Sequence, residues 1–258
     1  MPDNGQDKKH LLILGGTGEA RELARRVQLM IGKRVRVTTS LAGRRDAPPE
    51  LAGEVRTGGF GGVQGMMTYI AENAVDLVVD ATHPFSPTIS DHAAIACGNA
   101  MDGGTPRLQL VRPPWRFPPS AQWLEVGDFP AAAEILKGFA RRVFLTTGMR
   151  GLEAFSGLDD MWFLVRLLDE PDTPPPLKNH QVITGRPPYG LEDERAILAD
   201  HTIDTMVAKN AGGGATEAKI FAAGEAGVKI VLIRRPPPEP GPTAETVDEA
   251  FAWVEAQI

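Results

Sequence analysis

The sequence predicts an α/β protein made of two doubly wound halves, each a parallel sheet covered by helices. Three observations favour this class. Short apolar runs recur along the chain, they end in turns rich in glycine and threonine, and most of these turns precede residues with helical periodicity. A proline-rich stretch at 112–119 separates the halves. We therefore expect two domains, 1–115 and 116–258, with a ligand cleft between them; a single large sheet is the alternative.

The first strand–turn–helix unit begins at Leu11. Four apolar residues lead into the turn Gly15–Gly18, and apolar residues then recur at helical spacing up to Val27. The turn partly matches the dinucleotide fingerprint G-x-G-x-x-G/A, with Arg21 at the third position. Backbone N–H groups at such a helix start suit a phosphate, which favours a nucleotide site. A tight turn without a ligand is the alternative.

The second predicted strand, 35–40, bears on the choice of cofactor. In NAD-binding folds an acidic residue about 20 residues past the glycines holds the ribose 2′-hydroxyl. No acid occurs between Val35 and Arg45; hydroxyl residues are followed instead by Arg44 and Arg45. Hydroxyl and guanidinium groups suit a 2′-phosphate, so NADPH is expected rather than NADH. A solvated pair of loop arginines is the alternative.

The rest of the first half supplies more strand ends. A glycine-rich loop spans 56–62, a buried strand spans 76–82, and a further strand spans 106–111. Ligands of open α/β sheets bind at the carboxyl ends of the strands. We therefore expect one crevice lined by four segments, which are Gly15–Gly18, Thr39–Arg45, Thr57–Gly61 and Ala81–Phe85.

The second half repeats this rhythm, with strands expected at 142–148, 161–166, 182–186, 203–210 and 228–233 and a final helix up to Ile258. Lys209 and Asn210 stand at a strand end before the glycine turn 212–214. Such a turn binds carboxylates or phosphates through backbone N–H groups. It lacks the P-loop spacing, so ATP chemistry is not expected. A structural turn with a solvated lysine is the alternative.

Composition narrows the class of protein. The 258 residues carry a net charge of −6, which argues against broad nucleic-acid binding. The single cysteine, Cys97, excludes an intrachain disulfide, and the histidines lack metal-ligand spacing, so no metal is expected. No apolar run reaches about 18 residues, so we expect a soluble, cytoplasmic protein without a membrane segment. The catalytic residue is unknown, and no pattern indicates an oligomeric state.

Several blocks together resemble the precorrin-6A reductase family of cobalamin biosynthesis. The most specific are Asp80–Ser86, which reads Asp-Ala-Thr-His-Pro-Phe-Ser, and Lys209–Gly213, which reads Lys-Asn-Ala-Gly-Gly. The other blocks are 14–20, 39–43, 58–61 and 146–148, and all occur in the expected order. The family often has serine where this chain has Ala211, which leaves only a backbone contact at that position.

The resemblance implies an NADPH-dependent reduction of one ring double bond of precorrin-6A to give precorrin-6B. It also implies two Rossmann-like domains with cofactor and macrocycle in the cleft. The implied cofactor contacts are Gly16, Thr17, Glu19, Ala20, Ser40, Arg44, Gly58, Gly59, Thr82, His83, Pro84 and Phe85. The implied macrocycle side comprises Thr146, Thr147, Gly148, Lys209, Asn210, Gly212 and Gly213.

Other functions remain open at this stage. The substrate of the same reaction would be cobalt-precorrin-6A if the chain served the anaerobic route. A non-catalytic NADPH-sensing module would bind the cofactor without turning over any tetrapyrrole. A short-chain reductase is disfavoured, because neither Tyr69 nor Tyr189 is followed by lysine at the Tyr-x-x-x-Lys spacing.

Overall fold

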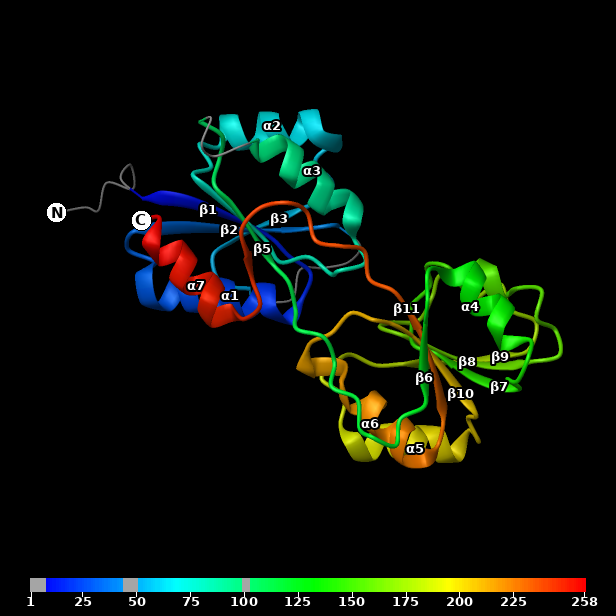
Figure 1. Cartoon of the computed structure of the whole chain (residues 1–258). Helices are drawn as coiled ribbons and strands as arrows, with labels where there is room; N and C mark the ends of the chain where they lie inside the picture. Colours follow the sequence, from blue (N-terminus) through cyan, green and yellow to red (C-terminus); the bar gives the residue numbers. More distant parts are fainter. Residues whose placement is uncertain (1–7, 44–50, 99–102) are drawn as a thin grey trace. The chain divides into compact units, whose positions relative to one another are not determined.

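The structure is a computed structural model that describes residues 8–43, 51–98 and 103–258 (Figure 1). The chain divides into two compact units, one made of Met1–Pro113 with Pro236–Ile258 and the other of Pro114–Arg235. The predicted boundary after residue 115 falls close to the observed one. The prediction was wrong for the C-terminal segment from Pro236 onward, which belongs to the first unit. A proline-rich stretch at 236–242 leads the chain back to the first sheet.

The sheet of the first unit is parallel throughout, with the strand order β12-β5-β4-β1-β2-β3. Its strands are β1 (Lys9–Leu14), β2 (Val35–Leu41), β3 (Glu54–Thr57), β4 (Leu77–Asp80), β5 (Arg107–Leu110) and β12 (Thr243–Ala244). The chain adds β2 and β3 on one side of β1 and then crosses to add β4 and β5 on the other. The strand order therefore reverses between β1 and β4, where such sheets bind ligands.

Both faces of this sheet are covered by helices, which explains why β1 reads as a continuous apolar run. Leu11 and Ile13 pack with α1 (Gly18–Ile31) and α7 (Val247–Ala256), while Leu12 and Leu14 pack with α2 (Gly62–Glu72) and α3 (Pro87–Cys97). Figure 1 shows these two helix pairs on opposite faces of the sheet. The doubly wound arrangement that the sequence predicts is thus present in the first unit.

The second unit has its own parallel sheet, with the order β6-β11-β10-β7-β8-β9. Its strands are β6 (Trp123–Val126), β7 (Arg142–Leu145), β8 (Trp162–Leu167), β9 (His180–Thr184), β10 (Thr205–Lys209) and β11 (Lys229–Ile233). Its helices are α4 (Phe129–Leu136), α5 (Leu191–Asp200) and α6 (Ala218–Ala226), with short 3₁₀ turns η2 (Leu152–Phe155) and η3 (Gly214–Thr216). The strand order reverses between β7 and β10. Two sheets confirm the two-half interpretation over a single large sheet.

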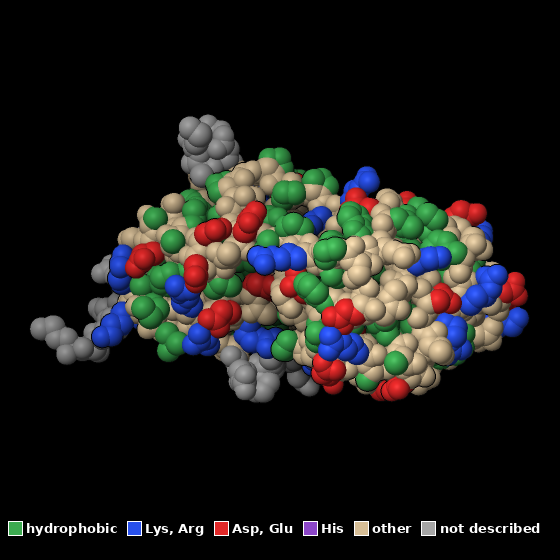
Figure 2. All heavy atoms as spheres, turned by 60° about the horizontal axis from the view of Figure 1, so that its bottom comes forward, with side chains coloured by type: hydrophobic (Ala, Val, Ile, Leu, Met, Phe, Trp, Pro, Cys, Tyr) green, Lys and Arg blue, Asp and Glu red, His purple; other side chains and the backbone are tan. Residues whose placement is uncertain are grey.

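The surface carries both signs of charge. Lys and Arg side chains lie interspersed with Asp and Glu on the face that Figure 2 shows. Across the described ranges 8–43, 51–98 and 103–258, no helix has the length and apolar character needed to cross a membrane. The same described residues contain no group of three or more His, Cys, Asp or Glu side chains suited to hold a metal ion.

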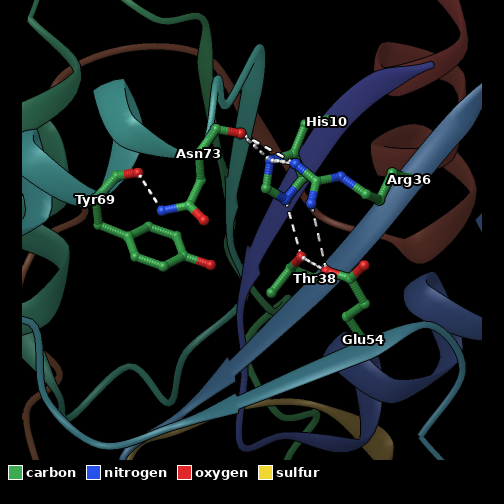
Figure 3. A network of polar contacts seen from close by, with 6 residues as sticks. All are labelled: His10, Arg36, Thr38, Glu54, Tyr69 and Asn73. Atoms are coloured by element: carbon green, nitrogen blue, oxygen red, sulfur yellow. Dashed lines mark hydrogen bonds and ion pairs between the residues drawn. The ribbon is translucent and has the colours of Figure 1, made fainter. Parts of the chain in front are cut away.

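A polar network ties together the amino ends of the first sheet (Figure 3). His10 of β1 is buried, and its Nε2 lies 2.8 Å from Thr38 Oγ1 of β2. Its Nδ1 lies 2.8 Å from an amino nitrogen of Arg36, and that same nitrogen donates at 3.0 Å to the Asn73 carbonyl. Thr38 in turn donates to Glu54 at 3.1 Å. His10 Nδ1 also lies 2.9 Å from the Asn73 carbonyl oxygen, so this nitrogen can donate to that carbonyl or accept from Arg36, but it cannot do both at once.

Burial, and secondarily the nearby charge of Arg36, lowers the pKa of His10 below its usual 6.5. The unfolded chain therefore binds a proton more readily than the folded chain. We expect the contribution of His10 to the free energy of unfolding to be complete above about pH 6.5. It should decline as the pH falls toward the pKa of His10 in the folded chain, by at most about 1.4 kcal/mol per pH unit.

Urea denaturation between pH 5 and 8 measures this effect. The fall in the free energy of unfolding at low pH should be smaller in His10→Gln. It should persist in His92→Gln, which replaces a histidine of α3 outside the network. An equal pH dependence in the wild type and in His10→Gln would contradict the assignment.

Candidate functional site

The turn after β1 stands at the reversal point of the first sheet. Thr17 caps α1, because its Oγ1 accepts a hydrogen bond from the backbone N–H of Ala20 at 3.1 Å. The same hydroxyl donates to the carbonyl of Ala81 at 2.7 Å. One buried side chain thus joins the turn after β1 to the turn after β4. The two turns, which the sequence predicts to line one crevice, thus lie together in the structure.

Two glycines of this turn are required for different reasons. A Cβ on Gly15 would lie 2.8 Å from Cγ2 of Thr39, so close packing against β2 excludes a side chain there. Gly16 has φ +105°, which side chains disfavour, and no described heavy atom lies within 4 Å of where its Cβ would be. The backbone of Gly16 therefore faces open space at the amino end of α1, the geometry that admits a phosphate.

Arg56, which sequence analysis did not select, dominates the ends of β2 and β3. Its guanidinium donates to Ser40 Oγ at 3.2 Å and to the carbonyls of Gly58 and Gly59 at 2.5 and 2.8 Å. It also lies 3.8 Å from the ring centroid of Phe60, a cation–π contact. A positive charge is thereby held beside three predicted cofactor contacts. The sequence feature that could have indicated Arg56 is its position, as a basic residue shortly before a glycine-rich turn. The predicted contact Arg44 lies outside the described residues.

The turn after β4 is organised by its own side chains. The buried Asp80 carboxylate accepts from the backbone N–H of Thr82 at 3.1 Å and from its hydroxyl at 2.7 Å. His83 Nδ1 accepts from the backbone N–H of Phe85 at 3.1 Å, and the two rings lie 5.9 Å apart. In the neutral ring the proton therefore sits on Nε2. These bonds hold the shape of the turn after β4, which Thr17 joins to the turn after β1.

Two further predicted contacts, Glu19 and Ala20, have structural partners. Glu19 of α1 forms an ion pair with Arg112 at 2.9 Å, so its carboxylate links the helix start to the chain after β5. Ala20 is fully buried against the sheet, which leaves only its backbone N–H, already donated to Thr17, facing the turn. In the sequence, Arg112 is only the first residue of the proline-rich stretch that separates the halves.

At the reversal point of the second sheet, two predicted blocks meet. Residues 146–148 follow β7 and residues 210–213 follow β10, and the backbone N–H of Thr146 donates to the Val207 carbonyl at 2.9 Å. Asn210 Nδ2 donates to Glu125 at 3.2 Å. Its buried Oδ1 has no hydrogen-bond partner among the described residues. A buried acceptor left unpaired at such an edge is suited to a ligand donor.

Basic side chains surround this second edge. Burial and the nearby charge of Arg150 lower the pKa of Lys209 to about 8. Arg166 is buried and forms a two-point ion pair with Glu194 at 2.6 and 3.0 Å. Arg186 and Lys178 form more exposed ion pairs, with Asp169 and Asp159 respectively.

Comparison with known proteins shows similarity to one family of reductases over almost the whole chain. A family model described as "Precorrin-6x reductase CbiJ/CobK" matches residues 10–255. A precorrin-6A reductase from Rhodococcus erythropolis is 43% identical over 247 residues, which is 95% of this chain and 96% of that protein. A solved structure described as "CobK precorrin-6A reductase" is 35% identical, with a TM-score of 0.88 and coverage of 96% of this chain and 97% of that one. A cobalt-precorrin-6A reductase from Priestia megaterium is 29% identical over 251 residues, which is 93% of this chain and 95% of that protein.

Proposed function

The chain belongs to the precorrin-6x reductase (CbiJ/CobK) family, and on that premise we propose that it reduces one ring double bond of precorrin-6A to give precorrin-6B, using NADPH, in cobalamin biosynthesis. It is an oxidoreductase of CH–CH bonds, and a reductase of this family implies a reduced nicotinamide cofactor. The observation that carries the proposal is the open glycine turn at the reversal point of the first sheet, where Gly16 faces empty space beside the start of α1.

NADPH, as distinct from NADH, is supported by the end of β2. No acidic residue stands between Val35 and Arg45 to hold a ribose 2′-hydroxyl. Ser40 and Arg56 lie together there instead, and a hydroxyl beside a guanidinium suits a 2′-phosphate. The bound cofactor would supply the hydride. The proposed tasks of the chain are to hold the phosphates at Gly16–Thr17 and the 2′-phosphate at Ser40, Arg56 and Arg44.

The macrocycle is proposed to meet the second edge. Precorrin-6A carries acetate and propionate groups, and Lys209 with the turn at Gly212 and Gly213 offers a cation and backbone donors to such carboxylates. Orientation of the ring against the nicotinamide is the main catalytic contribution expected of such a site. The other proposed contacts on this side are Thr146, Thr147, Gly148 and Asn210.

The metal-free substrate is favoured over the cobalt form. The relatives named precorrin-6A reductase are 36–43% identical to this chain, whereas those named cobalt-precorrin-6A reductase are 26–29% identical. Cobalt would in either case be part of the substrate and not a resident cofactor. A cytoplasmic location remains a prediction.

The test is an anaerobic assay with precorrin-6A and NADPH that follows nicotinamide absorbance and the pigment spectrum together. We expect both signals to change in equal molar amounts, with NADH at least tenfold less effective in kcat/KM. Turnover of only the cobalt form would move the chain to the anaerobic route. Cofactor binding without turnover of either substrate would contradict the proposed reaction and favour a sensing module.

A further inference from the structure

Lys219 is a buried amine beside the second reversal point. It lies in the first turn of α6, and only 5% of the residue is exposed. Its Nζ donates to Thr146 Oγ1 at 3.2 Å and lies 4.8 Å from the ring centroid of Trp115. An ammonium group has three N–H donors, and one hydroxyl and one aromatic face satisfy them poorly. A group buried at such cost beside a candidate site is a candidate for function.

The charges facing Lys219 leave it without a dedicated counter-ion. Glu194 of α5 is the one carboxylate among the charged groups that act on it, and Glu194 is already held by both amino groups of Arg166. The remaining charged neighbours, Arg166 and Lys209, are cations. Arg150 adds a further positive charge near Lys209. The charged groups that act on Lys219 are therefore two cations and one carboxylate that is already paired, an arrangement that favours an incoming anion.

Residues close to Lys219 belong to the proposed macrocycle side, namely Thr146 and the glycine turn at Gly213. Trp115 Nε1 donates to the Gly213 carbonyl at 2.9 Å, which fixes the glycine turn next to the amine. Gly213 has φ +79°, and no described heavy atom lies within 4 Å of where a Cβ of Gly214 would be. The position of a side chain on Gly214 is thus open space, a few residues before the start of α6. Trp115 therefore joins the two features, because its ring contacts the Lys219 amine and its Nε1 binds the glycine turn.

We propose that Lys219, together with Lys209, forms an oxyanion site at the end of β7 and β10, and that Lys219 takes up a proton from solvent when a ligand carboxylate or phosphate binds there. The inference deepens the proposed function, on which it rests. Its chemical balance is simple: the neutral amine gains one proton and pairs with one anionic oxygen. Burial, with Arg166 and Lys209, lowers the pKa of Lys219 to about 7 despite the opposing effect of Glu194. At pH 8 the empty site would then hold about a tenth of a proton on this amine.

Calorimetric titration at pH 8 in two buffers of different ionisation enthalpy measures the proton uptake. Two ligands are titrated separately, NADP⁺ and precorrin-6A without reduced cofactor, so no turnover occurs. We expect Lys219 to contribute about 0.9 proton per ligand bound for one of the two, because pairing raises its pKa well above 8. That ligand identifies whether the oxyanion is a phosphate or a carboxylate. Lys209 also titrates near this pH, so the Lys219 share is the difference between wild type and Lys219→Met.

Variants separate this role from a structural one. Lys219→Met should lose the Lys219 share of the proton uptake and bind the same ligand at least tenfold more weakly. Lys219→Arg, which stays charged, should bind the ligand but also lack that share of the uptake. Lys137→Met removes an exposed lysine at the C-cap of α4 and should match the wild type. Equal proton uptake by wild type and Lys219→Met for both ligands would overturn the inference even if precorrin-6A binds. A wild type that binds no precorrin-6A would instead overturn the proposed function, and the NADP⁺ arm alone would then decide the role of Lys219.

Discussion

Replacing Glu194 with glutamine is expected to lower the free energy of unfolding of the second unit by about 3–5 kcal/mol. Glu194 is completely buried and holds both amino groups of Arg166. Glutamine preserves the size of the side chain but leaves the guanidinium charged and without a counter-ion in a buried site. Arg166 also lies against the rings of Phe144 and Tyr189, at 4.7 and 4.2 Å, so it has little room to turn toward water.

Tryptophan fluorescence in guanidinium chloride measures this loss. Of the four tryptophans only Trp253 lies in the first unit, so a Trp253→Phe background makes the signal report on the second unit. Glu134→Gln is the matched control, since it breaks an ion pair that is largely exposed, with Lys137, and should cost less than about 1 kcal/mol. If the two variants lost the same stability, the buried pair would contribute no more than a surface pair.

Arg56→Met is expected to weaken NADPH binding by about 10- to 100-fold, because a charge-assisted hydrogen bond to the 2′-phosphate contributes about 1.5–3 kcal/mol. NADH lacks that phosphate, so its dissociation constant should change less than about threefold. The dissociation constants of both cofactors, measured by fluorescence titration, give the result. Comparison of the two cofactors is essential because Arg56 also bonds to Gly58 and Gly59 and so shapes the turn itself.

Three variants complete this experiment. Arg44→Ala tests the arginine chosen from the sequence and should narrow the preference for NADPH in the same direction. Arg25→Met removes an arginine of α1 that pairs with Glu22 and should leave both dissociation constants unchanged. Arg56→Lys should bind NADPH with an affinity between those of Arg56→Met and the wild type. Lysine keeps the positive charge but lacks the planar guanidinium that donates two hydrogen bonds to a phosphate. Equal losses for NADPH and NADH in Arg56→Met would make Arg56 a residue that shapes the turn and not a phosphate ligand.

Much of the strand pattern could be predicted because fully buried parallel strands leave a local signal. β1, β4 and β10 are short apolar runs that end in glycine or threonine turns. The run of apolar residues and the turn residues after it suffice to predict these strands. β3, β6 and β12 were missed because each is an edge strand of four residues or fewer and lacks an apolar run. The helix α4 was missed with them, although Asp128 caps it.

The sequence by itself therefore determined the α/β class, the two halves, the family resemblance and the turns that form the candidate site, since each depends on residues close together in the chain. Only the tertiary structure decided that the segment from Pro236 returns to the first sheet, and that Arg56 meets Ser40. It also decided that Lys219 lies beside Thr146, 73 residues away. Those contacts join distant parts of the chain, and their energy depends on burial and on neighbouring charge, which no local pattern encodes.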